Sequence, residues 1–497
     1  MFPHAGAVAL DDVQGLVRFG YKHHTQACFL LLRVKDREAA RAWLAAAPVT
    51  SAATIDPPPE TALQVALSSD GLRALGVPSD IVESFAAEFV SGMSSDASRA
   101  RRLGDVGANE PNRWQWGGGQ RVPHVLVLLY ALPGRLEVWQ RSIEAQCNAG
   151  FELLACLPSA DMHGIEPFGF VDGISQPELD WERQCPVRDT EQTAYSNLSC
   201  LGEFLLGYPN EYGGYTDRPL LDPRRDVQAL LPRAEDAPDV ADLGRNGSYL
   251  VMRQLRQDVH GFWQFLDRMA GGNPGLREHL AAAMVGRSLR GEPLVGPANE
   301  SFPGDGTPAE LNAFTYRTDP LGHRCPLGAH VRRTNPRNAD LPPGDPGIVS
   351  WLKRTLGFDA KALEQDLVAS TRFHRLLRRG REYGPAVSLA QALAGPSDAE
   401  PGLYFICLGA NISRQFEFVQ EAWVMSTHFN GLPNESDPLL GTRLPAPDGA
   451  RTDGFSMPQP EGPCQRLDGL PQFVTVLGGG YFFLPGIRAL RYLTTAC

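Results

Sequence analysis

The chain has 497 residues, of which 43% are hydrophobic, and a formal net charge of −11. This length suits a globular protein with two domains or one large one. The acidic balance argues against nucleic acid or a membrane surface as a partner, because both are bound through basic faces. No segment approaches the roughly eighteen apolar residues of a membrane helix, and residues 1–10 lack a signal-peptide pattern, so a cytoplasmic protein is expected. Nine cysteines without a close CxxC pair favour reduced thiols.

The first half of the chain alternates between strand-like and helix-like patterns. Apolar runs predict strands at 26–34, 61–68, 124–132 and 151–157. Helical spacing predicts helices after Asp36, over 78–92 and over 135–147, with an insertion loop at 104–120. Leaving the insertion aside, this order is the split βαβ pattern of a ferredoxin-like unit, in which helices cover one face of an antiparallel sheet.

The second half repeats the pattern at an offset of 220 residues. This offset places 249–253 on 29–33 without a gap, and Trp263 on Trp43. Strands are predicted at 247–255, 402–409 and 472–484, and helices at 258–270 and 413–425. We therefore expect an α+β fold of two ferredoxin-like units, residues 1–245 and 246–497, the second expanded by an insertion over 271–401.

A glycine-flanked turn places one carboxylate among apolar side chains. Asp172 lies between Gly169 and Gly173, which allow backbone angles that a side chain would block. Its neighbours include Phe170 and Ile174, so a partly desolvated carboxylate is expected, with a raised pKa that suits proton transfer in both directions. The alternative is that Asp172 only caps the turn through its own backbone.

Two later motifs are rich in basic residues. The segment 325–337 holds His330 beside Arg332 and Arg333 and closes on Asn-Pro, a turn signal. A third motif begins at Arg378 and runs Arg-x-Gly-x-x-Tyr-Gly. Taken singly, a histidine is more often a surface or core residue than a metal ligand, and an arginine is more often a solvated charge.

The three motifs together resemble those of the dye-decolorising peroxidases, a heme enzyme family. Its marks are a Gly-x-x-Asp-Gly turn, an Ala-His-x-Arg-Arg-Thr-Asn-Pro-Arg segment and the arginine motif, and all three stand here in the expected order. The resemblance implies two ferredoxin-like units, with heme b held mainly by the second. It also implies hydrogen-peroxide-dependent oxidation of bulky aromatic donors, such as dyes and phenols, through a ferryl heme intermediate.

Two other interpretations remain open at this stage. A heme-binding or iron-handling protein with incidental peroxidase activity needs only His330 and a pocket, so the presence of Asp172 and Arg378 favours the peroxidase. A heme-free interaction module gives no reason for the three motifs to coincide. Hydrogen peroxide and aromatic reductants are therefore the expected partners, and the chain is expected to be a monomer or a homo-oligomer.

The resemblance also assigns roles to residues around the heme. His330 would be the axial ligand of the iron, with Cys325 as a competing ligand. Asp172 would act as the distal acid and base, and Arg378 would stabilise charge on the departing hydroxide. Glu417 is the expected acceptor for the second nitrogen of His330, unless it is only a charge at a helix edge.

Further residues are expected to form the walls of the heme site. Alternation along 402–408 sends Leu403 and Phe405 to one face, where they resemble the family's apolar wall, and core packing is compatible with that role. One of Arg332 and Arg333 is expected to bind the heme propionates, with Arg333 favoured. Trp351 or Tyr383 could relay electrons from substrates at the surface.

Overall fold

The computed structural model describes residues 6–184, 197–296, 307–337, 371–395, 400–446 and 449–495. The first half contributes four strands to a central sheet: β1 (Gln26–Val34), β2 (Thr61–Leu67), β3 (Val125–Ala131) and β4 (Phe151–Pro158). Helix α2 (Arg37–Ala46) follows β1 and is capped by Asp36, as predicted, and α7 (Leu136–Cys147) follows β3. The strands lie antiparallel in the order β4-β1-β3-β2. The four predicted strands of this half are therefore confirmed.

The chain between β2 and β3, which includes the predicted insertion loop at 104–120, is built from short helices and 3-10 turns. These are α3 (Ser69–Ala74), α4 (Ser79–Val82), α5 (Ala87–Ser91), α6 (Ala97–Leu103) and the 3-10 turns η1 (Gly107–Asn109) and η2 (Pro111–Arg113). The sequence predicts one helix over 78–92, and the structure divides it into α4 and α5. At the break, the backbone N–H of Ala86 donates to the hydroxyl of Tyr249 at 3.0 Å instead of continuing the helical ladder.

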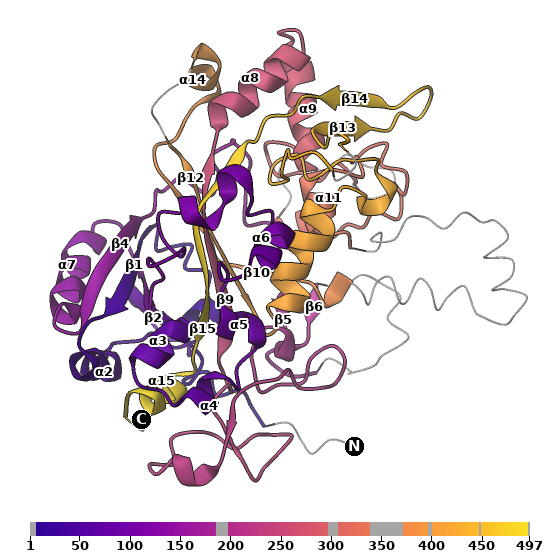
Figure 1. The fold of residues 1–497 in the computed structure, drawn as a ribbon. Helices are drawn as coiled ribbons and strands as arrows, with labels where there is room; N and C mark the ends of the chain where they lie inside the picture. Colours follow the sequence, from indigo (N-terminus) through magenta and orange to yellow (C-terminus); the bar gives the residue numbers. More distant parts are fainter. Residues whose placement is uncertain are drawn as a thin grey trace, which may run out of the picture.

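The second half supplies the rest of the sheet. Its strands are β9 (Ser248–Gln257), β10 (Leu377–Arg378), β11 (Arg381–Tyr383), β12 (Gly402–Gly409) and β15 (Val474–Leu484). They lie in the order β10-β12-β9-β15, with β11 also on β12. Helix α8 (Val259–Met269) follows β9 as predicted. β15 also pairs with β2, through Phe483 and Leu67, which joins the two groups into one sheet (Figure 1).

The predicted helix at 413–425 has π-helical geometry. It consists of η5 (Ser413–Glu417) and η6 (Val419–Met425). Just before its first residue, the side chain of Asn411 accepts a hydrogen bond from the backbone N–H of Arg414 at 2.8 Å. A π-helix has more residues per turn than an α-helix, so a 3.6-residue period misplaces side chains along it.

The remaining described elements surround the sheet. The helices and 3-10 turns are α1 (Gly15–Arg18), α9 (Pro274–Val285), α10 (Pro308–Asn312), α11 (His330–Thr334), α14 (Leu389–Ala394), α15 (Ile487–Thr495), η3 (Leu201–Glu203), η4 (Pro223–Arg225) and η7 (Phe429–Gly431). Three small sheets pair β5 (Glu178–Leu179) with β6 (Leu198–Ser199), β7 (Leu220–Leu221) with β8 (Ala241–Asp242), and β13 (Gly454–Met457) with β14 (Gln465–Asp468). The fold is therefore mixed α+β around a large antiparallel sheet.

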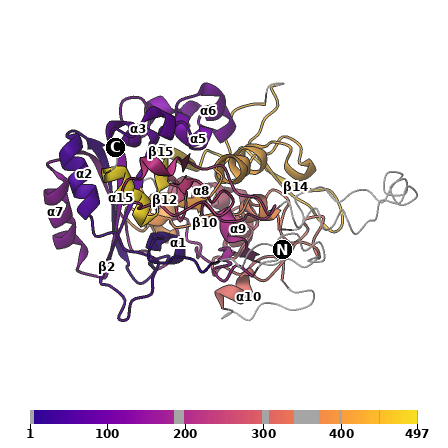
Figure 2. The same cartoon turned by 90° about the horizontal axis from the view of Figure 1, so that it is seen from below.

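Both faces of the sheet are buried, because alternate side chains of each strand enter different hydrophobic clusters. In β1, Cys28 belongs to the cluster under α2 and α7, whereas Phe29 belongs to the cluster under α1. In β12, Cys407 and Ile406 divide in the same way. Figure 2 shows α3, α5 and α6 along one side of the sheet and α1 on the other.

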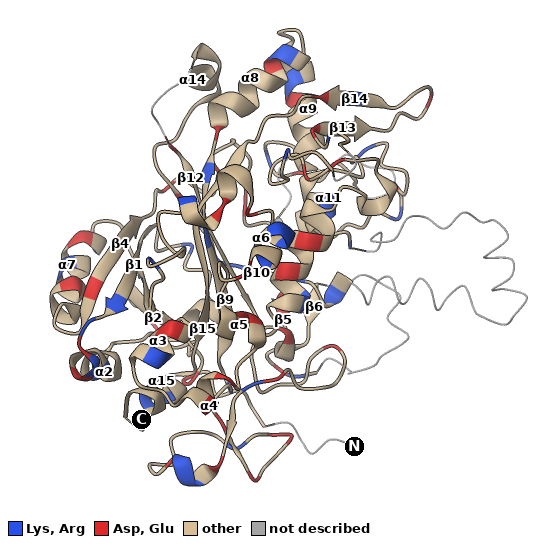
Figure 3. Cartoon of the chain, viewed as in Figure 1, with Lys and Arg blue, Asp and Glu red and all other residues tan. Residues whose placement is uncertain are grey.

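Acidic and basic side chains are interspersed along the visible elements rather than separated by sign (Figure 3). Within the described ranges, no helix combines the length and the apolar character needed to cross a bilayer.

Candidate active site

The turn that carries Asp172 is held by the half-buried carboxylate of Glu166. Gly169 and Gly173 have φ values of +102° and +76°, a region that favours glycine. Glu166 accepts hydrogen bonds from the backbone N–H groups of Phe168 and Phe170, at 3.1 and 3.0 Å, and from Gln257 at 2.7 Å. The hydrogen bonds to Glu166 therefore fix the conformation of the turn and the direction of the Asp172 side chain.

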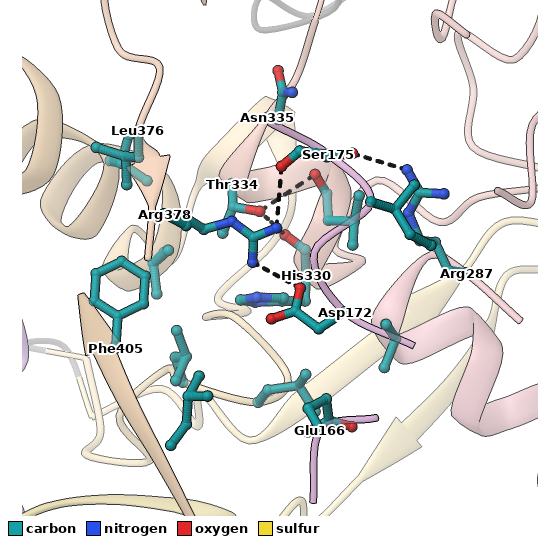
Figure 4. A pocket seen from close by; sticks show the side chains of 18 of the residues that line it. Glu166, Asp172, Ser175, Arg287, His330, Thr334, Asn335, Leu376, Arg378 and Phe405 are labelled. Carbon is teal, nitrogen blue, oxygen red and sulfur yellow. Dashed lines mark hydrogen bonds and ion pairs between the residues drawn. The ribbon is translucent and has the colours of Figure 1, made fainter. Parts of the chain in front are cut away.

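Asp172 meets Arg378, which lies 206 residues later in the chain. Nη1 of Arg378 lies 3.0 Å from Oδ1 of Asp172, and Nη2 donates to the carbonyl of Ser175 at 3.2 Å. The side chains of Asp172 and Arg378 are 31% and 32% exposed, so small molecules can reach both. Figure 4 shows the two groups pointing toward one another, with the ring of His330 beside them.

The pKa of Asp172 moves in the direction opposite to the expected one. Burial raises the pKa of Asp172, but the charge of Arg378 and the hydrogen bonds from Arg378 and the backbone of Gly173 outweigh it. The net pKa therefore lies below its usual range, and the carboxylate is ionised near neutral pH. The expectation of a raised pKa is wrong because it counts desolvation without the arginine.

Strand alternation explains how Arg378 reaches this place. In β10, Leu377 pairs with Leu408 and is buried in the cluster under α1, so Arg378 faces the opposite side of the sheet. On that side Leu403 and Phe405 of β12 line the same cavity as Arg378. The alternation that places Leu403 and Phe405 on one face is confirmed.

His330 lies at the start of α11 and is oriented by a carboxylate. Its Nδ1 lies 2.9 Å from Oδ2 of Asp437, which is fully buried. The other oxygen of Asp437 accepts the backbone N–H groups of Leu439 and Leu440, both at 2.9 Å. Burial raises the pKa of Asp437, but the charge and hydrogen bond of His330 outweigh it, so its pKa is lowered. An ionised Asp437 requires Nδ1 of His330 to carry the proton, which leaves Nε2 free to coordinate a metal.

Asp437 occupies the role that the sequence assigns to Glu417. Glu417 instead accepts from the hydroxyl of Tyr481 at 2.9 Å and lies 2.9 Å from Nε of Arg99. It is absent from the cavity lining, whereas its neighbour Phe416 lines it. The expectation for Glu417 is therefore wrong: the π-helical backbone turns Phe416 toward the cavity and Glu417 away from it. No periodic pattern marks Asp437, which follows Asn-Glu-Ser in a loop.

Arg332 and Arg333 are fully buried and make their hydrogen bonds inside the protein. Arg333 donates to the carbonyls of Trp423 and Ser426, at 2.8 and 2.9 Å, and also to those of Gly328 and Glu435. Arg332 contacts Asp319 and the carbonyl of Cys325. Neither arginine lines the cavity, so the expectation that one of them binds propionates is wrong. They hold the loops around α11 instead.

The cavity has a volume of about 260 Å³ and brings the expected residues together. Its wall includes Asp172, Arg378 and His330, and its apolar lining includes Ile174, Leu403, Phe405, Phe416 and Trp423. Cys325, the competing ligand, is buried outside the lining, and burial raises the pKa of its thiol to about 12. Of the two candidate relay residues, Tyr383 is buried against Tyr404, and Trp351 lies outside the described residues.

No family model matches the chain. The multifunctional dye peroxidase DyP2 of Amycolatopsis sp. is 31% identical over 452 residues, covering 87% of this chain and 82% of that protein. This chain belongs to the dye-decolorising peroxidase family. The dye-decolorising peroxidase AauDyP1 of Auricularia auricula-judae is 27% identical over 98% of this chain. A crystal structure of a DyP-type peroxidase from the same fungus matches with a TM-score of 0.72 at 25% identity, covering 99% of this chain and 100% of that one.

As a dye-decolorising peroxidase, this chain is an enzyme of a family that uses heme, and its cavity fits that cofactor. The lining is largely apolar, which suits the faces of a porphyrin. Among the described residues, Nε2 of His330 has no hydrogen-bond partner, and no carboxylate pairs with Arg287 in the cavity wall. Figure 4 shows Arg287 on the Ser175 side of the cavity. An imidazole and a cation without an anion are the groups that would meet an iron and a propionate.

Proposed function

We propose that this dye-decolorising peroxidase binds heme b in the described cavity, with His330 as axial ligand, and oxidises bulky aromatic donors with hydrogen peroxide. One observation carries the proposal. The Asp172–Arg378 ion pair and the free nitrogen of His330 line one apolar cavity, although they come from three distant segments. Heme storage would require only the imidazole and the pocket.

The chain's own residues account for the handling of peroxide. Heme, when bound, would supply the redox-active iron that reduces hydrogen peroxide and takes electrons from the donor. The ionised carboxylate of Asp172 accepts a proton from one oxygen of hydrogen peroxide and returns it to the other oxygen as that oxygen leaves as water. Arg378 holds the peroxide and stabilises the negative charge that develops on the leaving oxygen.

The other residues position and tune the site. Asp437 keeps the proton of His330 on Nδ1 and makes the imidazole a stronger electron donor. Leu403 and Phe405 exclude water from the reacting oxygens. Arg287 is the residue we assign to a propionate in place of Arg332 and Arg333.

The substrate class is proposed from chemistry and from relatives. The relatives are dye-decolorising peroxidases by name, and a solved dye-decolorising peroxidase of similar fold is in complex with 2,6-dimethoxyphenol. We propose phenols and dyes as donors for this chain. We propose that bulky donors deliver their electrons from the protein surface.

We also propose a domain organisation and a cellular compartment for the chain. We propose that residues 1–245 and 246–497 each contain a ferredoxin-like unit. The strand order β4-β1-β3-β2 and the corresponding order β15-β9-β12-β10 support this division. A reducing compartment such as the cytoplasm is proposed because the described cysteines are free thiols.

The test uses the heme-loaded protein and three variants. In the wild type, hydrogen peroxide should support oxidation of 2,6-dimethoxyphenol and of a bulky dye. His330→Ala should lose the axial imidazole signature in its absorption and electron paramagnetic resonance spectra, and Asp172→Asn and Arg378→Ala should retain it but lose turnover. An iron-handling protein would give a different result, because its heme behaviour and its low peroxidase rate would be the same in wild type, Asp172→Asn and Arg378→Ala.

A further inference from the structure

Cys28 and Cys156 lie in contact at the end of the central sheet that is farthest from β10. In the antiparallel pairing of β1 with β4, Cys28 is opposite Pro158, and Cys156 is opposite Leu30. The two cysteines are therefore diagonal neighbours on one face, and their Sγ atoms lie 3.2 Å apart. A disulfide bond is about 2.05 Å long, so a movement of roughly 1 Å would join the two sulfurs.

The two thiols have different surroundings. Cys28 is fully buried in the core cluster under α7, whereas Cys156 is exposed on β4, the edge strand of the sheet. The side-chain amide of Gln140, on α7, donates to Sγ of Cys156 at 3.2 Å and also to Glu144 at 2.8 Å. Solvent, and any oxidant dissolved in it, reaches Cys156 first.

Hydrogen bonding makes Cys156 the better nucleophile. The hydrogen bond from Cys28, helped by the one from Gln140, lowers the pKa of Cys156, and these bonds outweigh burial and the charge of Glu144. The pKa of Cys28 is raised by the same contact and by burial. The pair thus combines an accessible thiolate with a neighbouring thiol whose sulfur can attack an oxidised Cys156 as its proton passes to the leaving hydroxyl.

We propose that Cys28 and Cys156 form a peroxide-driven thiol–disulfide site, separate from the heme cavity. The thiolate of Cys156 attacks one oxygen of hydrogen peroxide, so an S–O bond forms, the O–O bond breaks and hydroxide leaves. The sulfur of Cys156 loses two electrons and becomes a sulfenic acid. Cys28 then attacks this sulfur, so the S–S bond forms and the hydroxyl leaves with the proton of Cys28 as water. The sum is one peroxide reduced to water and two thiols oxidised to a disulfide.

The position of the pair separates this chemistry from that of the heme cavity. β4 lies at one end of the sheet and β10, which carries Arg378, lies at the other. Figure 1 shows β1, β4 and α7 on the left of the molecule and α11, which carries His330, on the right. The oxidant is the cosubstrate of the peroxidase itself, so the enzyme meets it whenever it works. A disulfide here would tie the edge strand β4 to β1.

The test follows thiols rather than dye oxidation. Heme-loaded protein is reduced with a dithiol, freed of the reductant, treated with a few equivalents of hydrogen peroxide, alkylated and mapped by mass spectrometry. We expect a disulfide between Cys28 and Cys156. Cys28→Ser should accumulate a sulfenic acid at Cys156 that reacts with dimedone, and Cys156→Ser should leave Cys28 reduced.

An internal control is provided by Cys464, an exposed thiol that donates to the carbonyl of Gln465. Cys156 should be oxidised about tenfold faster than Cys464, because hydrogen bonds from Cys28 and Gln140 lower the pKa of Cys156 and a second thiol lies 3.2 Å away. The disulfide should also form in Asp172→Asn, since heme turnover plays no part in it. Equal oxidation of Cys156 and Cys464, or loss of the disulfide in Asp172→Asn, would overturn the proposal. If the serine variants fail to fold, peptide mapping of the wild type and Asp172→Asn decides alone.

Discussion

The side chain of Gln176 accepts a hydrogen bond from the backbone N–H of Arg378 at 3.0 Å and donates one to its carbonyl at 3.2 Å. Gln176 lies four residues after Asp172 in the same turn. The paired hydrogen bonds therefore fix the distance between the two segments that carry the acid–base carboxylate and the cation. The sequence shows both segments but gives no sign that one amide joins them.

Replacing Gln176 by alanine should loosen the Asp172–Arg378 pair without removing either group. We expect kcat/KM for hydrogen peroxide to fall about tenfold, since a displacement of about 1 Å can cost up to a hundredfold. Stopped-flow mixing with peroxide measures this rate. Gln146→Ala is the matched control, because Gln146 donates to Ser142 on the exposed face of α7. Equal rates in both variants would show that Gln176 does not position the site.

Asp437→Asn should weaken electron donation by His330. The neutral amide cannot hold the Nδ1 proton as strongly, so the Fe(III)/Fe(II) midpoint potential should rise and heme affinity should fall about 10- to 100-fold. Spectroelectrochemistry and heme titration measure the two quantities. Glu417→Gln is the control, because Glu417 contacts Tyr481 and Arg99 rather than His330. A shift in potential for Glu417→Gln but not for Asp437→Asn would restore the original assignment.

The pH dependence of peroxide reactivity should report the Asp172–Arg378 pair. A base acts only when deprotonated, so the wild-type rate should hold as the pH falls until it passes the lowered pKa of Asp172. In Arg378→Ala, the charge and hydrogen bond of Arg378 no longer oppose burial, so the pKa of Asp172 should rise. The acidic limb of kcat/KM for hydrogen peroxide should then move to higher pH.

Arg379→Ala is the control for this pH shift. Arg379 is the next residue of the chain, but its guanidinium donates to the carbonyls of Leu16 and Val17. Its loss should leave the acidic limb where the wild type has it. An unmoved limb in Arg378→Ala would mean that Asp172 is not the titrating base.

Arg333→Lys should destabilise the fold although it keeps the charge. An ammonium group cannot reach the four carbonyls that the guanidinium of Arg333 contacts, so we expect a loss of about 2–4 kcal/mol in the free energy of unfolding. Urea denaturation followed by circular dichroism measures it. Arg101→Lys, on the exposed face of α6, should change stability by less than about 0.5 kcal/mol. A stable Arg333→Lys protein with weak heme binding would favour a propionate role instead.

Much of the fold was accessible from sequence because it depends on local patterns. Continuous apolar runs marked the long strands, and alternation within 402–408 placed Leu403 and Phe405 on the cavity side. The short motifs identified Asp172, His330 and Arg378, which the structure brings to one cavity.

The wrong predictions concern contacts between residues that are far apart in the sequence, and a helix whose geometry is not α-helical. The prediction for Glu417 is wrong because a π-helix does not follow a 3.6-residue period. Asp437 reaches His330 from a loop 107 residues later, where no pattern marks it. The pKa of Asp172 depends on how close Arg378 lies to it, and the sequence does not give the distance between the two side chains.

The most direct test mixes heme-loaded protein with one equivalent of hydrogen peroxide and follows the heme absorption by stopped flow. Wild type, Asp172→Asn and Arg378→Ala are compared at neutral pH, with Arg379→Ala as the control. The account predicts that the second-order rate constant falls about 10²- to 10⁴-fold in the first two variants and stays near the wild-type value in the control. A rate constant in Asp172→Asn and Arg378→Ala equal to that of the wild type would contradict it.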